Sequence, residues 1–189
     1  MGLFSIEHSR AAYRADFWLY GVAVTLLSAV LLLGAPAGMS LELLLLAGAG
    51  GALWTLGEYL LHRFVLHGLP PFRRWHAEHH QRPTALIGSP TILSASLIVL
   101  MVFLPAWWWS DVWAAIAFSL GVTAGYLGYS VMHHAMHHWR SERPWFRNRQ
   151  RCHALHHRRQ GPPGCYGVTT SVWDRVFGTH GRSVLDTTG

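Results

Sequence analysis

The stretch VWAAIAFSLGVTAGYLGYSVM, residues 112–132, is followed at once by His133-His134-Ala135-Met136-His137-His138. Its first part carries no charged residue, and it has the roughly 20 residues that a helix needs to cross ~30 Å of hydrocarbon. Its second part brings together several imidazoles, the commonest side-chain ligands for metal ions. One such cluster at the end of an apolar helix could be chance, whereas several of them would indicate metal ions at a membrane surface.

Three further apolar segments precede this one, at residues 16–33, 41–61 and 90–109. Charged residues make up 13% of the chain, about half of the ~25% that is typical of soluble proteins. A buried helix of a soluble protein can also be apolar on all sides, but four such segments in one short chain favour a membrane. We therefore predict an all-α polytopic membrane protein with transmembrane helices at about 16–33, 41–61, 90–109 and 112–132. The cytosolic histidine-rich helical cap comprises residues 62–89 and 133–189, within a single domain of residues 1–189.

The basic residues indicate the orientation of these helices. The net charge of +6 comes from arginine, since the sequence contains no lysine. Arginines precede the first apolar segment and follow the second and the fourth, whereas the other two connections carry none. This is the positive-inside pattern. We therefore expect an integral protein of a bacterial inner membrane with both termini in the cytoplasm. The same pattern accounts for the basicity without a nucleic-acid partner, so we expect none.

The two cysteines, Cys152 and Cys165, lie in the arginine-rich C-terminal part. On the predicted topology they face a reducing cytoplasm, where a disulfide is not expected. Cys152 neighbours His153 and offers a soft metal ligand. A small buried thiol is the interpretation that we favour for it.

The histidines gather in four clusters, and their spacing suits helices. The clusters are His62-Arg-Phe-Val-Leu-His67, His76-Ala-Glu-His79-His80, His133-His134-Ala-Met-His137-His138 and His153-Ala-Leu-His156-His157. Residues three or four apart share one face of a helix, so the second and fourth clusters each present one face. Because the second and fourth apolar segments end on the arginine-rich side, all four clusters are expected to converge in one layer beneath the membrane.

The first cluster poses a geometric question. His62 and His67 are five residues apart, which places them roughly 140° apart around a straight α-helix. Either the helix is distorted so that both reach one site, or the two side chains ligate different ions.

The number of imidazoles bears on the number of metal ions. Imidazole nitrogen suits iron, zinc or copper, and the ligands exceed the four that one tetrahedral ion needs. Two ions with several histidines each fit the sequence better than one. Two iron ions would activate dioxygen and two zinc ions would favour hydrolysis, and the spacing does not decide between them.

These clusters carry a resemblance to a known family. The chain resembles the membrane fatty acid hydroxylase/sterol desaturase superfamily, and most closely its fatty acid 2-hydroxylase branch. The resemblance covers roughly residues 55–180. Its motifs are Glu58-Tyr-Leu-Leu-His62-Arg-Phe-Val-Leu-His67, His76-Ala-Glu-His79-His80, His133-x-x-x-His137-His138, His153-x-x-His156-His157 and the ending Tyr166-Gly-Val-Thr-Thr-Ser-Val-Trp-Asp174-Arg-Val-Phe-Gly-Thr179.

The resemblance implies dioxygen-dependent hydroxylation of an unactivated C–H bond in a lipid by two iron ions, which zinc can replace in a purified sample. On a fatty acyl chain this is 2-hydroxylation, with the lipid entering from the bilayer. The implied metal ligands are His62, His67, His76, His79, His80, His133, His137, His153, His156 and His157. Groups expected to support these ligands are Glu58, His138 and Asp174, because ligating imidazoles usually donate their other N–H to a carboxylate or carbonyl.

Eukaryotic members of this branch with a fused cytochrome domain exist, and 189 residues leave no room for such a domain. We therefore expect a separate electron donor, a b-type cytochrome or a ferredoxin. Its docking face is expected among the arginines that follow the fourth segment, namely Arg140, Arg143, Arg147, Arg149, Arg158 and Arg159. The alternative interpretation of these arginines is retention on the inner side and contact with anionic headgroups.

Two other functions fit parts of the pattern. A carotenoid or sterol hydroxylase or oxidase of the same superfamily would use similar histidine motifs. A histidine-rich membrane metal transporter or sensor would place polar ligands near the bilayer midplane, and the midplanes of all four apolar segments lack them.

Overall fold

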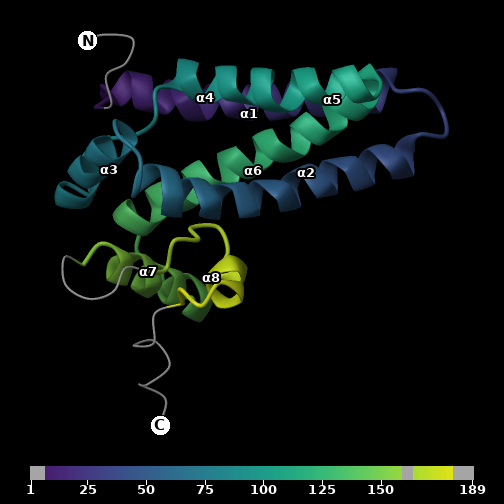
Figure 1. Cartoon of the computed structure of the whole chain (residues 1–189). Coiled ribbons are helices and arrows are strands. Elements are labelled where there is room, and N and C mark those ends of the chain that lie inside the picture. The colour runs from purple at the N-terminus through teal and green to yellow at the C-terminus, as the bar shows by residue number, and fades with distance from the viewer. Residues whose placement is uncertain (1–6, 159–163, 181–189) are drawn as a thin grey trace. The chain divides into compact units, whose positions relative to one another are not determined.

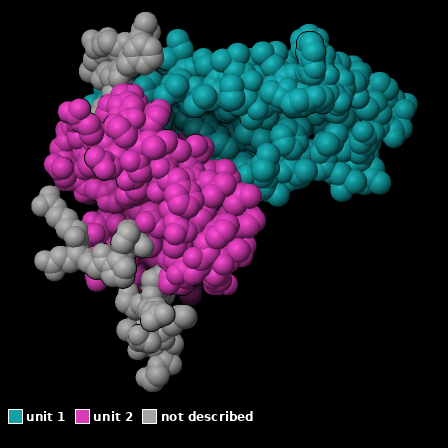
Figure 2. Space-filling view, in the orientation of Figure 1, with its two compact units in different colours: residues 1–54, 86–128 teal, residues 55–85, 129–189 magenta. Residues whose placement is uncertain are grey.

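The computed structural model describes residues 7–158 and 164–180. Within these ranges the regular elements are helices, apart from an isolated antiparallel bridge between Glu7 and Ile87. The chain divides into two compact units (Figure 2). The first unit comprises residues 1–54 and 86–128, and the second comprises residues 55–85 and 129–189.

The first unit contains the greater part of the long helices (Figure 1). Its helices are α1 (Arg10–Gly34), the larger part of α2 (Ser40–Leu60), α4 (Thr91–Ile98), the π-helix η2 (Val99–Phe103), α5 (Leu104–Trp109) and the first part of α6 (Val112–His138). The π-helical stretch η2 precedes Pro105. Proline has no N–H to donate to the preceding turn of an α-helix, and local irregularities of this kind are expected beside it.

Among the described residues, four continuous helical spans are long and apolar enough to cross a membrane: Arg10–Gly34, Ser40–Leu66, Thr91–Trp109 and Val112–His138. Many large apolar side chains of these spans are exposed, among them Leu32 at 84% and Leu33 at 89%. Contact of so much apolar surface with water would be unfavourable. Contiguous exposed apolar surface of this kind marks a face that contacts lipid. The prediction of an all-α membrane protein with four transmembrane helices is confirmed.

Three of the four spans in the described residues extend beyond their predicted apolar segments, whereas Thr91–Trp109 stays within its predicted segment. α1 begins at Arg10 rather than near Asp16, because the Ser9 hydroxyl caps the helix by accepting the Ala12 N–H at 3.2 Å. The second span continues through the π-helix η1 (Leu61–Leu66), and α6 continues to His138. Apolarity marks the part of a helix that lies in hydrocarbon, whereas capping and backbone hydrogen bonds set its ends.

Close packing of α2 against α6 in the first unit depends on glycine. A Cβ atom added to Gly50 would lie 2.2 Å from the carbonyl oxygen of Phe118, and one added to Gly121 would lie 1.9 Å from that of Ala47. Small residues at such positions let membrane helices approach closely. On the other side of the unit α1 lies alongside α4, where the hydroxyls of Tyr20 and Ser94 are 2.7 Å apart.

The second unit holds the remaining helices. They are η1, α3 (Phe72–Gln81), the last part of α6, α7 (Pro144–His156) and α8 (Val172–Val176). α7 begins at Pro144, because proline fits the first turn, where no intrahelical N–H bond is needed. Between α7 and α8 the described chain resumes at Gly164 and forms a loop, Gly164–Thr169, that is largely buried.

The cysteines correct an expectation. Cys152 on α7 and Cys165 in the loop form a disulfide, with their Cα atoms 5.6 Å apart. The expectation that no disulfide forms is therefore wrong, and so are the favoured interpretation of Cys152 as a small buried thiol and its alternative as a soft metal ligand. The expectation rested on the redox compartment alone, and the sequence does not show that α7 and the loop bring the two side chains together.

Candidate metal centre

Ten histidines of the second unit form two groups of five. Within each group the candidate ligand nitrogens lie within 4.8 Å of one another. The first group, here called the His62 group, consists of His62, His67, His76, His80 and His156. The second, the His79 group, consists of His79, His133, His137, His153 and His157. These are the ten histidines that the resemblance implied as ligands.

The π-helix η1 answers the geometric question at His62 and His67. The N–H of His67 donates to the carbonyl oxygen of His62 at 3.2 Å, which is the i to i+5 bond of a π-helix. This turn brings the two rings to a centroid distance of 5.2 Å. Of the two alternatives left open by the sequence, the structure shows the distorted helix that places both side chains in one group.

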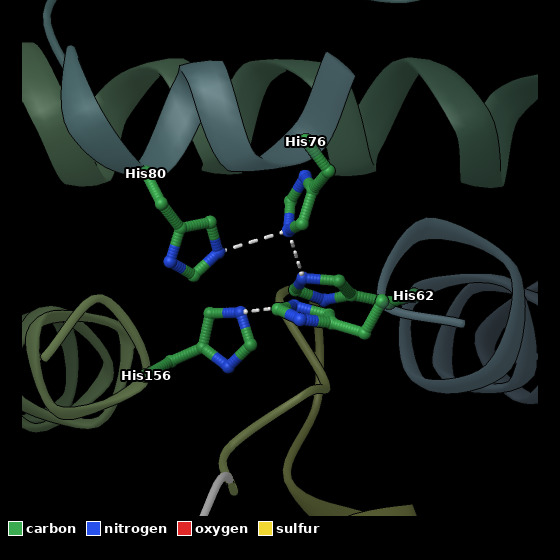
Figure 3. A group of neighbouring side chains, drawn as sticks. His62, His76, His80 and His156 are labelled. Carbon is green, nitrogen blue, oxygen red and sulfur yellow. Dashed lines mark hydrogen bonds between the residues drawn. The ribbon is translucent and has the colours of Figure 1, made fainter. Parts of the chain in front are cut away.

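Neighbouring residues on α3 belong to different groups. His76 and His80 lie one turn apart and join the His62 group, whereas His79 joins the other. Figure 3 shows His76 and His80 from α3 and His156 from α7 pointing toward His62. The end of α7 divides in the same way, because His153 and the C-cap residue His157 join the His79 group. α3 and the end of α7 therefore each contribute ligands to both groups, whereas His62 and His67 belong to the first group alone and His133 and His137 to the second.

The Nε2 atoms converge in a way that suits a cation. The Nε2 atom of His76 lies 3.0 Å from those of both His62 and His80. Nε2 atoms are also 3.0 Å apart in His67 and His156, and 2.8 Å apart in His137 and His153. Since a backbone carbonyl only accepts, His62 must donate from Nδ1 to the carbonyl oxygen of Tyr166 at 2.6 Å. Its Nε2 then carries a lone pair, the form that binds a metal ion.

Burial keeps these imidazoles neutral. Loss of hydration is the main cause that lowers the pKa of His80 to about 4, of His79 and His156 to about 3, and of His157 to about 2. The neighbouring imidazoles lower these pKa values further. Buried nitrogens of His79, His153 and His157 have no hydrogen-bond partner within the described parts of the chain. Neutral, buried and unpartnered nitrogen donors fit a transition metal such as iron or zinc.

The two carboxylates predicted to support the ligands, Glu58 and Asp174, contact the backbone of a loop rather than the imidazoles. Glu58 is 3% exposed and accepts hydrogen bonds from the N–H groups of Val168 and Thr169 and from the Thr169 hydroxyl. Asp174 is fully buried and accepts the N–H groups of Tyr166 at 2.8 Å and Gly167 at 2.9 Å. Neither carboxylate has a hydrogen bond to a histidine among the contacts of the described residues. Both instead hold the loop Gly164–Thr169, whose carbonyl groups accept hydrogen bonds from His62 and His156.

Arg149 is a further residue of this network, and the sequence placed it wrongly. It was expected on an exposed docking face, but it is 7% exposed, and its guanidinium donates to the carbonyl oxygens of Gly167 at 2.6 Å and Val168 at 2.7 Å. Arg140, Arg143, Arg147 and Arg158 are exposed. Arg159 lies outside the described residues. The number of arginines in a connection does not show which of them is buried. Arg149 lies on α7 between the exposed Arg147 and Arg151, so the local sequence does not indicate its burial either.

His138 does not belong to either group. Its side chain is exposed and its ring stacks on that of His134, with centroids 4.4 Å apart. The structure thus gives no support to its predicted role beside the ligands. Glu78, which lies between His76 and His79 in sequence, is half-exposed and pairs with Arg82 at 3.8 Å, so it does not take part in either group.

The sequence and the fold are similar to those of known hydroxylases. A family model for fatty acid hydroxylases matches residues 47–179. The dihydroceramide fatty acyl 2-hydroxylase FAH2 of Arabidopsis thaliana is 32% identical over 194 residues, which cover 88% of this chain and 78% of that protein. The ceramide very long chain fatty acid hydroxylase SCS7 of Saccharomyces cerevisiae is 34% identical over 152 residues, which cover 69% of this chain and 36% of that protein.

A solved structure of full-length scs7p, in which only the hydroxylase domain is visible, has the same fold. It aligns with a TM-score of 0.73 at 28% identity, covering 87% of this chain and 66% of that one. The matched residues 47–179 include both histidine groups and the three buried charged side chains that hold the loop. The chain therefore belongs to the fatty acid hydroxylase family.

Proposed function

We propose that this protein hydroxylates C2 of a fatty acyl chain in a membrane lipid, using dioxygen and two iron ions. The observation that carries the proposal is the pair of five-histidine groups, built from neutral buried imidazoles in a membrane protein of this family. The acyl chain and the position C2 rest on the named activities of the relatives, among them FAH2. The same names favour an acyl substrate over a carotenoid or a sterol.

In this proposal each group holds one iron ion, and zinc can take its place in a purified sample. When bound, the two ions would activate dioxygen for attack on an unactivated C–H bond. The overall reaction consumes one C–H bond, dioxygen, two electrons and two protons, and it yields one C–OH group and water. Because the ligands are imidazoles and none is a carboxylate, the set of donor atoms is neutral. The low pKa values of the histidines mean that protons do not compete with the metal ions for the imidazole nitrogens.

The protein's own residues supply orientation and a dry site. The fixed tautomer of His62 presents Nε2 rather than a proton, and the loop Gly164–Thr169 holds that tautomer through the carbonyl of Tyr166. The burial of His76, His153 and His156 limits the access of water. The exposed apolar side chains of the four spans support a substrate that arrives from the bilayer.

The electrons would come from a separate donor, a b-type cytochrome or a ferredoxin. Arg140, Arg143 and Arg147 are exposed and are suited to an acidic partner surface. We further propose that the two units work together as one hydroxylase domain. Its cap would lie on the cytoplasmic side of a bacterial inner membrane, the side of both termini. The Cys152–Cys165 disulfide would persist in that reducing compartment because both cysteines are buried and out of reach of cytosolic thiols.

Lipid mass spectrometry of a host that lacks 2-hydroxy lipids tests this function. Expression of the protein should produce 2-hydroxyacyl lipids under aerobic growth. His137→Ala, which removes a member of the His79 group, should abolish them, and the adjacent His138→Ala, an exposed position outside both groups, should not. An unchanged lipid profile with the unaltered protein, or full activity of His137→Ala, would contradict the proposal.

A further inference from the structure

The two histidine groups differ in what holds their imidazoles. In the His62 group, His62 donates from Nδ1 to the carbonyl oxygen of Tyr166 at 2.6 Å, and His156 donates from Nδ1 to that of Gly164 at 2.9 Å. In the His79 group, both ring nitrogens of His79 and His157 and Nδ1 of His153 are buried without a hydrogen-bond partner in the described part of the structure. Two imidazoles of the His62 group are therefore oriented by backbone carbonyl groups, whereas His79, His153 and His157 have no such contact in the described part of the structure.

Both carbonyls that orient the His62 group belong to the loop Gly164–Thr169. Arg149 of α7 donates to the carbonyl oxygens of Gly167 and Val168, the two residues that follow Tyr166. From the other side Asp174 of α8 accepts the N–H groups of Tyr166 and Gly167. Backbone groups of three consecutive residues, Tyr166, Gly167 and Val168, are thus fixed by charged side chains that are themselves buried.

Two further features restrict this loop. Glu58 of α2 accepts the N–H groups of Val168 and Thr169. The disulfide ties Cys165, between the two orienting carbonyls, to Cys152 on α7. The loop is consequently held to α2, α7 and α8 at once, and the orientation of its carbonyl groups is set before any metal ion binds.

The contacts between this loop and the histidines fall in one group. Among the hydrogen bonds of the described residues, the loop binds imidazoles of the His62 group alone. A metal ion in that group therefore meets imidazoles whose orientation is already fixed.

We propose that the two metal positions are unequal, with the His62 group binding its ion more tightly, and that Arg149 is the residue that positions the loop for it. This inference rests on the proposed function, because it takes both groups as metal positions. The physical reason is preorganisation. His62 and His156 do not lose orientational freedom or change tautomer when they bind, whereas His79, His153 and His157 must be ordered by the ion itself.

Titration of the metal-free protein in detergent with Zn²⁺, followed by competition with a chromophoric chelator, tests the inference. The unaltered protein should bind two ions in two steps that differ by about tenfold or more in dissociation constant. His67→Ala should remove the tight step and His137→Ala the weak one, which assigns the steps to the groups. Two equal steps, or the reverse assignment, would overturn the proposal, and neither depends on a variant of Arg149.

The role of Arg149 is tested by Arg149→Lys, which keeps the charge but cannot hold two carbonyl oxygens with one planar group. It should weaken the tight step about 10–100-fold and leave the weak step unchanged. Arg147→Lys is the matched control, because Arg147 is exposed on the same helix, and it should leave both steps unchanged. Equal weakening of both steps by Arg149→Lys, or no weakening, would refute the positioning role.

These results are separable from the proposed function. Two unequal Zn²⁺ steps without any lipid hydroxylation in the expression experiment would leave the inference standing and remove the function. Hydroxylation of lipid by a protein that binds two Zn²⁺ ions in two equal steps would leave the proposed function standing and remove the inference.

Discussion

The N–H of His67 donates to the carbonyl oxygen of His62 across a π-helical turn, at 3.2 Å. The turn brings two imidazoles that are five residues apart into the same group of five. π-helical turns recur at functional sites because they rotate side chains relative to the flanking α-helix. Here the turn lies at the end of a span that crosses the membrane, where it adds a ligand position to the helix without adding a loop.

The division into two groups predicts which histidine substitutions release the same metal ion. His62→Ala and His67→Ala should each release the same ion, so the double variant should still retain the other one. His67→Ala combined with His79→Ala should release both. Metal content measured by plasma mass spectrometry, on protein whose helicity is checked by circular dichroism, decides this. Loss of both ions from the His62/His67 double variant would show that the grouping is wrong.

The buried carboxylate of Glu58 predicts that the conservative substitution Glu58→Gln lowers the stability of the fold. Glu58→Gln keeps the shape but replaces a charged acceptor, and its amide N–H₂ would face the donors Val168 and Thr169. The free energy of unfolding should fall by about 1–3 kcal/mol, measured by thermal or denaturant unfolding in detergent. Glu42→Gln is the control, since Glu42 is exposed at the start of the same helix. Equal stability of the two variants would contradict the loop-holding role.

Gly167 predicts a second effect in the loop. A Cβ atom there would lie 2.0 Å from the carbonyl oxygen of Thr170 and 3.0 Å from Oδ2 of Asp174. Gly167→Ala should therefore displace the loop, destabilise the fold by roughly 1–3 kcal/mol and weaken metal binding at the His62 group. Gly57→Ala, on α2 with open space around the added atom, should show neither effect. A Gly167→Ala protein with unaltered Zn²⁺ titration would count against the account of the loop.

The disulfide predicts the chemical state of both cysteines. Cys152 and Cys165 should resist iodoacetamide in the unfolded, unreduced protein and react after reduction, as read by peptide mass spectrometry. Because the bond closes a loop of sequence separation 13, Cys165→Ser should lower the free energy of unfolding by about 3 kcal/mol. Labelling of both cysteines without reductant would rule out the bond.

The sequence predicts the four spans because length and apolarity are local properties of a segment. It also predicts that the four histidine clusters gather, because helical spacing and the arginine bias bring them to one side. The choice of ten ligands within these clusters came from the family resemblance. The division into two groups is not predictable in this way. His79 and His80 are neighbours in sequence and belong to different groups, and the membership of His67 depends on one irregular turn.

The residues that the sequence misplaces are those whose role depends on distant contacts. Arg149 looks like its exposed neighbours on α7, and its partners lie 18 and 19 residues further along the chain. Glu58 was predicted to touch a histidine, yet its partners are 110 and 111 residues away. Burial and pairing of this kind come from tertiary structure, so neither charge nor spacing shows them.

Incorporation of labelled oxygen tests the central claim most directly. The iron-loaded protein would be placed in phosphatidylcholine nanodiscs that contain dihydroceramide, with a reduced ferredoxin and ¹⁸O₂. The account predicts a 2-hydroxyacyl product that carries one ¹⁸O atom, and no such product from His137→Ala. A product whose hydroxyl oxygen comes from water, or an unmodified acyl chain in the presence of bound iron and reductant, would contradict it.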